Sequence, residues 1–331
     1  MNWPTDWTWW LAGAAAVAVA LVAALPWIIQ PILRGMLWPH YAIRVRGLEH
    51  LPATGPALLV LNHVTWLDGF IIAAACPRRG RALVNATYIN LPVFRHIARR
   101  AGLIPVPNAG PRALRGAIEA ARAALAAGQV VAIFPEAQLT RNGLTGHFFR
   151  GLELMLPDRE RTPVIPVYLD NLWGSIFSFS EGRTILKRPR SFRRRVVGVA
   201  FGPPVAPPIT AFSARQAVVA AGVRAFEVRP RALPVLETLD PALPRLVHPE
   251  FGLLAASTVD YDCGGFAQTG QVPGTLGRPV PGVALRAVDS EGKPLGPDAE
   301  GGLQVLLAGK PDWIDLGTRG SLDKDGFVRP C

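Results

Sequence analysis

Cysteine is scarce in this sequence of 331 residues. The three cysteines, Cys76, Cys263 and Cys331, show neither C-x-x-C spacing nor histidines at ligand spacing. A structural zinc site needs several such ligands close together, and a disulfide-stapled secreted domain needs cysteines in pairs. The pattern therefore excludes a zinc-finger or disulfide-framework protein, and we expect a reduced compartment and no metal site.

Charge is absent from residues 7–33, although 18% of the whole chain is charged. As a helix, its most apolar part (residues 9–29) would span about 30 Å, the hydrocarbon thickness of a bilayer. Basic residues before the apolar run, which a secretory signal needs, are also missing. We expect residues 1–39 to be a retained membrane anchor rather than a cleaved leader. It would be a transmembrane helix or, because Pro26 and Pro31 interrupt it, a re-entrant or interfacial hairpin.

Acidic residues are outnumbered, 24 against 35 Lys and Arg, for a net charge of +11. Arginine gathers at residues 95–100 and 183–195 without the interleaved aromatic residues that nucleic-acid stacking requires. An anionic lipid leaflet is the favoured partner, and a solvated basic face is the alternative. Arg34, Arg44 and Arg46 follow the apolar run, so the positive-inside rule predicts an inner-membrane protein whose remaining chain faces the bacterial cytoplasm.

Residues 40–230 alternate short apolar runs with helical patterns. This order predicts an α/β domain with a mixed, mostly parallel sheet flanked by helices. The expected strands are residues 43–52, 57–62, 129–136, 162–169 and 196–205, and the clearest helix is residues 111–128.

Proline-rich residues 231–250 predict a linker, followed by a small β-rich segment over residues 251–331. In that segment, "VALRAVD" (283–289) and "GGLQVLL" (301–307) predict a pair of strands. A piece this small is marginally stable alone, so we expect it to dock on the first domain or on a partner.

The stretch "LNHVTWLDGF" (61–70) places His63 just after a buried strand and Asp68 five positions later. The carboxyl end of a strand is where α/β domains place active sites. On one continuous helix the two side chains would point about 140° apart. They can meet only if His63 lies in a loop and Asp68 in the first helical turn, and the pair is otherwise a spacing that chance often supplies.

In this context the stretch "NHVTWLD" resembles the first signature block of PlsC-type glycerolipid acyltransferases. "GLIPVPNAGPRAL" (102–114), "IFPEAQLTRNG" (133–143) and "VIPVYLDNLWGS" (164–175) resemble the family's later blocks in the family's order, so the resemblance covers about residues 40–205. The most similar variety is the acyltransferase part of bifunctional 2-acylglycerophosphoethanolamine acyltransferase/acyl-carrier-protein synthetases.

The resemblance implies an O-acyltransferase that moves a fatty acyl group from acyl-CoA or acyl-carrier protein to the free hydroxyl of a lysophospholipid, without a further cofactor. A neutral imidazole can deprotonate that hydroxyl, and a carboxylate can orient the imidazole. His63 and Asp68 would be the catalytic pair. The residues expected to bind substrate are Asn62, Phe134, Pro135, Glu136, Thr140, Arg141, Arg112 and Arg150.

Two positions depart from the family pattern. Asn108 stands where the second block commonly has an arginine for the acceptor phosphate, and Arg112 is a possible substitute. Ala137 stands where the third block has glycine, a change that a backbone with positive φ would penalise. These departures favour a lysophospholipid with a head group over plain lysophosphatidate, and an acceptor without phosphate, such as an ornithine lipid, is a further option.

Residues 251–331 resemble part of the core of adenylate-forming acyl ligases, in "PGTLGRPVPGVALRAVD" and "WIDLGTRGSLDKDGFV". The phosphate loop of that family is missing, and Thr318 stands in place of its ribose-binding aspartate. We therefore expect a remnant without ligase activity, with a docking surface as the role it could keep. The alternative to an acyltransferase is a lipid- or acyl-carrier-binding protein that has lost turnover.

Overall fold

The computed structural model describes residues 7–89, 98, 100–107, 110–156, 161–180, 194–230, 239–263 and 265–331. Its main domain is a seven-stranded sheet in the order β1-β7-β6-β2-β5-β3-β4. Every neighbouring pair is parallel except β6 and β7, which run antiparallel. The strands are β1 (Tyr41–Arg46), β2 (Ala57–Leu61), β3 (Gly80–Asn85), β4 (Leu103–Val106), β5 (Val130–Ile133), β6 (Val164–Asp170) and β7 (Arg195–Phe201).

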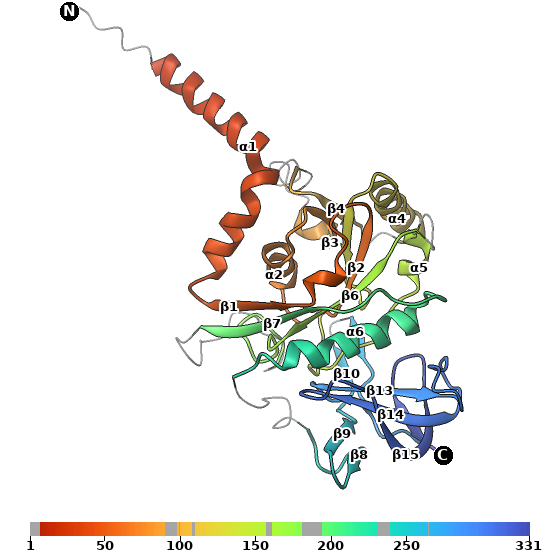
Figure 1. Cartoon of the computed structure of the whole chain (residues 1–331). Helices are drawn as coiled ribbons and strands as arrows, with labels where there is room; N and C mark the ends of the chain where they lie inside the picture. Colours follow the sequence, from red (N-terminus) through yellow and green to blue (C-terminus); the bar gives the residue numbers. More distant parts are fainter. Residues whose placement is uncertain are drawn as a thin grey trace, which may run out of the picture.

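Helices cover both faces of this sheet (Figure 1). One core packs the end of α1 and α2 against it, and the other packs α4, α5 and α6. The helices are α1 (Trp7–Leu37), α2 (Asp68–Ala75), α4 (Gly110–Ala126), α5 (Gly151–Met155) and α6 (Ala211–Phe226). The predicted α/β class with a mixed, mostly parallel sheet is confirmed.

Strand β2 shows why the sequence forms this arrangement. All of its side chains are buried, as expected for a central strand covered on both faces. Leu59 and Leu61 enter the core beneath α2, whereas Leu58 and Val60 enter the core beneath α4. The continuous apolar run thus serves two cores at once, and it ends where the polar residues Asn62 and His63 begin.

Helix α1 begins well outside the domain and ends on it. Figure 1 shows its first part projecting away and its second part beside α2. Gln30 Nε2 donates to the Cys76 carbonyl at 2.5 Å, Arg34 Nε donates to the Ala74 carbonyl at 2.8 Å, and Leu33 and Leu37 are buried. The end of α1 is therefore committed to packing against the domain.

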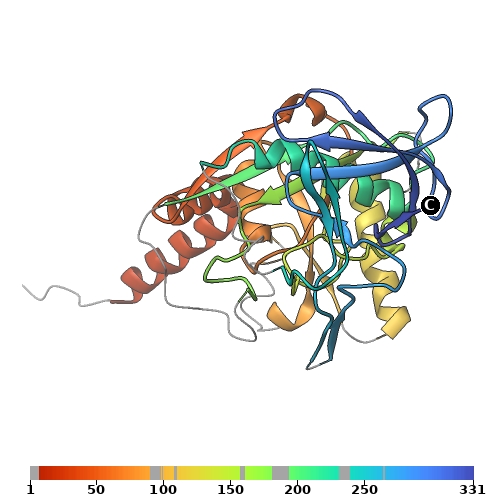
Figure 2. The same ribbon diagram turned by 90° about the horizontal axis from the view of Figure 1, so that it is seen from below.

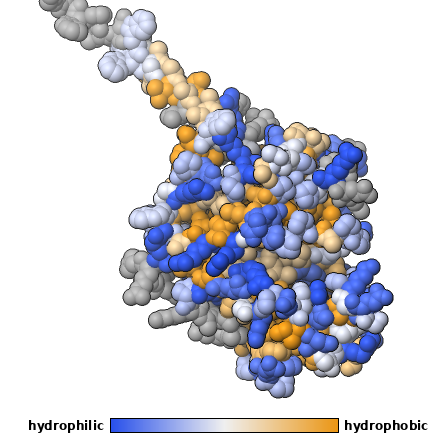
Figure 3. Space-filling view, in the orientation of Figure 1, coloured by the Kyte–Doolittle hydropathy of each residue, from blue (hydrophilic) through white to orange (hydrophobic). Residues whose placement is uncertain are grey.

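The described part of the chain contains no helix that is both long enough and apolar enough to cross a membrane. The transmembrane helix predicted from residues 9–29 is not supported in that form. A helix is present at the predicted place, but its last turns carry Arg34 and pack on α2. The projecting part exposes large apolar side chains, among them Trp9 and Trp10, and Figure 3 shows apolar residues along it.

The C-terminal strands form three small sheets, β12-β9-β8, β10-β11 and β13-β14-β15-β16. Figure 2 shows these strands gathered beside α6. They are β8 (Arg245–His248), β9 (Gly252–Ala256), β10 (Tyr261–Cys263), β11 (Phe266–Gln268), β12 (Arg278–Pro279), β13 (Val283–Val288), β14 (Gly301–Leu307), β15 (Ile314–Leu322) and β16 (Val328–Pro330). The predicted strand pair, β13 with β14, is confirmed.

The linker expected over residues 231–250 is described only in part, because residues 231–238 lie outside the described part. Its later residues include β8, which pairs antiparallel with β9. We keep the name C-terminal segment for residues 239–331.

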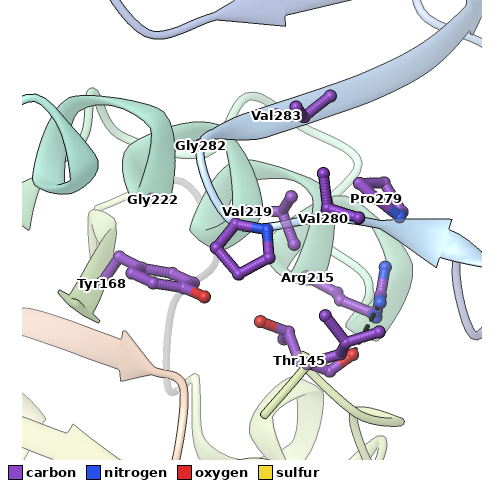
Figure 4. A pocket seen from close by; sticks show the side chains of 11 residues that line it. Thr145, Tyr168, Arg215, Val219, Gly222, Pro279, Val280, Gly282 and Val283 are labelled. Atoms are coloured by element: carbon purple, nitrogen blue, oxygen red, sulfur yellow. Dashed lines mark hydrogen bonds between the residues drawn. The ribbon is translucent and has the colours of Figure 1, made fainter. Parts of the chain in front are cut away.

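Helix α6 joins the two parts of the molecule because it is apolar on two sides. Its capping box, Thr210 with Ser213, fixes where it begins. Ala214 and Val218 pack on the sheet, whereas Val219 and Val223 pack on the C-terminal segment. Figure 4 shows this seam, where Val219 and Tyr168 face the turn Pro279–Val283. The space between them is about 10 Å³, near the lower limit for one water molecule.

Candidate active site

His63 and Asp68 meet at the carboxyl end of β2. His63 lies in the loop after the strand, and Asp68 is the first residue of α2. The Nδ1 atom of His63 is 2.8 Å from Asp68 Oδ2. The predicted strand, loop and helix around this pair are confirmed, and the five-residue spacing brings the two side chains together rather than apart.

Asp68 is fully buried and its carboxylate is held from several directions. The amides of Val64 and Thr65 donate to Oδ2 at 2.5 and 3.0 Å, and the Thr65 hydroxyl donates to Oδ1 at 2.6 Å. Because these donors fix both oxygens, the carboxylate is an acceptor for His63. The proton of the neutral imidazole is then held at Nδ1, and Nε2 keeps a free lone pair.

The ring of His63 is placed by stacking as well as by Asp68. It lies on Phe134, with ring centroids 4.3 Å apart and planes 25° apart. Its side chain is 24% exposed, while that of Asp68 is 0% exposed. A base that is partly open to solvent, above a fully enclosed partner, can take a proton from a bound hydroxyl group.

The carboxylate of Glu136 holds the loop that carries His63 through hydrogen bonds to the backbone. Oε1 accepts from the amide of His63 at 2.8 Å, and Oε2 accepts from the amide of Gly146, also at 2.8 Å. Burial raises the pKa of Glu136 to about 7. The side chain is 4% exposed and both oxygens bind backbone amides, so Glu136 holds the backbone of His63 in place. Its expected part in binding substrate stays a prediction.

Thr140 and Ala137 belong to the loop that follows β5, residues 134–147. The amide of Thr140 donates to the His63 carbonyl at 2.9 Å, and its hydroxyl donates to the Leu144 carbonyl at 2.9 Å. Thr140 is buried, so it shapes the loop. Ala137 has φ 54°, the left-handed conformation that favours glycine. The departure from the family pattern at this position therefore carries backbone strain.

Arg141 follows Thr140 in the same loop and brings a guanidinium group to it. Its guanidinium carbon lies 3.5 Å from the ring centroid of Phe179, 4.8 Å from that of Phe266 and 5.1 Å from that of Tyr261. Within the described residues, its buried Nε has no hydrogen-bond partner and no carboxylate forms an ion pair with it. Burial lowers the pKa of this guanidinium. Among the described residues, this positive charge thus has no carboxylate partner.

The remaining predicted binding residues lie elsewhere or have other partners. Asn62 is buried and ties β2 to β6 through both backbone groups of Leu169, at 2.8 and 3.1 Å. Pro135 accepts from the amide of Phe149. Arg150 is 84% exposed and pairs with Glu153 on α5, and the structure does not bring it to His63. The side chain of Arg112 and all of Asn108 lie outside the described residues.

Several residues of the site escaped the sequence analysis. Thr65 had a signal, since Thr-x-x-Asp before an apolar run is a helix-start pattern. Gln268, Tyr261 and Phe266 had none, because only the fold brings them to the loop at 134–147. His147 pairs through Nδ1 with Asp325 of the C-terminal segment. No group of metal-ligating side chains occurs among the residues that the structure describes.

Comparison with known proteins agrees with this geometry. Residues 42–170 match the family model described as Acyltransferase. A chloroplastic 1-acyl-sn-glycerol-3-phosphate acyltransferase of Arabidopsis thaliana is 24% identical over 46% of this chain and 45% of its own. An uncharacterized protein of Mycobacterium leprae is 34% identical over 33% of this chain and 29% of its own. The chain thus spans less than half the length of these relatives.

A solved structure shares the fold. The 1-acyl-sn-glycerophosphate acyltransferase PlsC of Thermotoga maritima has a TM-score of 0.50 and 20% identity, and the similarity covers 64% of this chain and 83% of that one. Residues 42–170 are thus similar to the acyltransferase family, and the main domain shares the fold of the Thermotoga protein. The resemblance of the C-terminal segment to acyl ligases stays a prediction.

Replacing Ala137 with glycine should stabilise the protein. A left-handed residue with a β-carbon costs about 1–2 kcal/mol, and glycine gives back about 0.5–1 kcal/mol of it as chain entropy. We expect the free energy of unfolding of Ala137→Gly to rise by about 0.5–1 kcal/mol, measured by urea denaturation. A fall in stability would mean that the loop does not hold Ala137 in this conformation. Ala123→Gly, on the exposed face of α4, is the control, and it should destabilise.

Glu136 predicts a pH dependence of stability. Its pKa in the folded protein, about 7, is above the ordinary value of 4.5, so the fold binds this proton more tightly than the unfolded chain does. The corresponding stability is complete below pH 4.5 and is lost as pH rises toward 7, by on the order of 3 kcal/mol. Comparing wild type with Glu136→Gln between pH 5 and 8 should show a slope that only the wild type has.

Glutamine also turns an N–H group toward one of the two amides, so Glu136→Gln should be less stable overall by about 1–3 kcal/mol. Glu119→Gln, on the exposed face of α4, is the control and should keep the wild-type slope. Equal slopes for wild type and Glu136→Gln would show that burial does not shift this carboxyl.

Proposed function

We propose that this protein transfers a fatty acyl group from a thioester to the free hydroxyl of a lysophosphatidate-type lipid. The observation that carries the proposal is the His63–Asp68 pair, with its carboxylate enclosed and its imidazole partly open. The match of residues 42–170 to the acyltransferase family supports the reaction type. The chloroplastic relative, a 1-acyl-sn-glycerol-3-phosphate acyltransferase by name, supports the acceptor class.

His63 would act as the general base. Its Nε2 takes the proton of the acceptor hydroxyl while that oxygen attacks the thioester carbonyl carbon. Asp68 keeps the Nδ1 proton in place and stabilises the imidazolium that forms. The tetrahedral intermediate then breaks its carbon–sulfur bond, and the imidazolium returns the proton to the leaving thiolate. The acceptor oxygen is itself the nucleophile, so no acyl-enzyme is needed.

Arg141 would bind the acceptor phosphate. A guanidinium carries its N–H groups in its own plane, where two oxygens of a phosphate can accept from them. The stacking on Phe179 occupies a face of Arg141, and the unpartnered Nε lies at its edge. A phosphomonoester and a phosphodiester head group both meet this chemistry. Lysophosphatidate and lysophospholipids with head groups are therefore the acceptors to compare.

The acyl donor would be acyl-CoA or acyl-carrier protein, and the reaction would take place at a membrane surface, because the acceptor is a lipid. The exposed tryptophans of α1, Trp7, Trp9, Trp10 and Trp27, are side chains suited to the interface of a bilayer. Location at the cytoplasmic face of a bacterial inner membrane belongs to the same proposal. It rests on the arginines that follow α1.

The test is acyl transfer from labelled acyl-CoA and acyl-carrier protein to a panel of lysophospholipids, without ATP. Removing a general base lowers the rate by about 10²- to 10⁴-fold, so His63→Ala should lose at least about a hundredfold. His248→Ala, a half-buried histidine of β8 that stacks on Phe251, is the matched control and should keep wild-type activity. The acceptor with the highest kcat/KM identifies the head group.

Two results would overturn this proposal. Wild-type activity in His63→Ala would remove the base from the mechanism. No product with any acceptor from folded wild-type protein would favour a lipid- or acyl-carrier-binding protein without turnover.

A further inference from the structure

The loop over residues 137–146 is held by side chains of the C-terminal segment. Gln268 is buried at the end of β11 and makes the central contacts. Its Oε1 accepts from the Arg141 amide at 2.5 Å, and its Nε2 donates to Asn142 Oδ1 at 2.9 Å and to Thr140 Oγ1 at 3.3 Å. One amide side chain thus binds three consecutive residues of the loop.

Two more hydrogen bonds cross the same boundary. Asn142 Nδ2 donates to the Thr258 hydroxyl at 2.8 Å, and Gln138 Nε2 donates to the Ala267 carbonyl at 2.9 Å. On its other side the loop is bonded to the catalytic turn, through Thr140 and the His63 carbonyl at 2.9 Å. The same loop therefore contacts His63 through Thr140 and contacts the C-terminal segment through Thr140 and the two residues that follow it.

The same segment surrounds the guanidinium of Arg141. Tyr261 and Phe266 lie on β10 and β11, a two-stranded sheet whose register also carries Gln268. Phe179 from the main domain completes the group of rings. Rings cover the faces of a guanidinium and leave its in-plane N–H groups for an anion. The position of Arg141 depends on both parts of the molecule.

We infer that the acceptor site is composite, with Gln268 of the C-terminal segment as a positioning residue that holds Arg141 toward an anionic lipid head group. This inference rests on the proposed function. It gives the C-terminal segment a part in substrate binding. The docking of that segment does not depend on Gln268, because α6 supplies a separate apolar contact in which Val219 and Val223 pack on Ala284 and Leu306.

Gln268→Ala is the direct test, and Gln304→Ala is its matched control. Gln304 lies in β14 of the same segment and accepts from Arg286, away from the loop at 137–146. Both variants lose one glutamine of the C-terminal segment, but only the first loses contacts with Arg141. Thermal unfolding of each variant shows that it is folded before binding is measured.

The measurement is equilibrium binding of lysophosphatidate and of uncharged monoacylglycerol to the full chain in detergent micelles. Loss of a charge-assisted contact worth 1.4 kcal/mol is about a tenfold change in affinity. We expect Gln268→Ala to bind lysophosphatidate about tenfold more weakly and monoacylglycerol as the wild type does. The kinetic counterpart is a KM for the phosphate acceptor raised about tenfold, with the KM for the acyl thioester unchanged. Gln304→Ala should match the wild type for both lipids.

A folded Gln268→Ala that binds lysophosphatidate with wild-type affinity overturns the inference, and so does an equal loss of affinity for monoacylglycerol. Binding does not require turnover. A wild type that binds lysophosphatidate but transfers no acyl group would contradict the proposed function alone. Normal transfer with unchanged binding in Gln268→Ala would contradict the composite site alone.

Discussion

The site depends on one enclosed carboxylate. Asp68 starts α2 with no exposed surface, and it accepts from the amides of Val64 and Thr65 and from the Thr65 hydroxyl. These contacts fold the chain between β2 and α2 into a tight turn and orient the ring of His63. The same carboxylate therefore begins a helix and orients the imidazole proposed as the base. A change at Asp68 would disturb the fold and the chemistry together.

A second carboxylate extends the arrangement to the rest of the molecule. Glu136 joins the amide of His63 to that of Gly146, and the Gly146 carbonyl accepts from the buried Arg215 of α6 at 2.9 Å. Burial lowers the pKa of Arg215 to about 9. Since α6 also carries the C-terminal segment, the catalytic turn, the loop after β5 and that segment form one connected structure.

The sequence predicted the parts of this structure that local patterns encode. The apolar run of β2, followed by Asn62 and His63, indicated a buried strand with polar residues at its end, and Asp68 before an apolar run indicated a helix start. The contacts of Glu136 were not predicted, because a Pro-Glu pair in the sequence does not show which atoms its oxygens bind. The family pattern implied substrate, whereas the structure shows two backbone amides.

Long-range contacts account for the rest. Gln268 is 127 residues from Arg141 in sequence, and no periodicity links them. The sequence alone could say only that Ala137 is unfavourable if its φ is positive, since φ is a property of the folded loop. Helix α1 was expected from its lack of charge, but the bonds of Gln30 and Arg34 to the end of α2 depend on tertiary packing.

The central claim is that Asp68 keeps a proton on Nδ1 of His63 and leaves Nε2 free to act as the base. Nitrogen-15 NMR of histidine-labelled protein at pH 7.5, with His63→Ala to assign the signals, reports which ring nitrogen carries hydrogen. We predict that the neutral imidazole of His63 carries its hydrogen on Nδ1. Hydrogen found mainly on Nε2, or exchanging between the two ring nitrogens as in free histidine, would contradict the account.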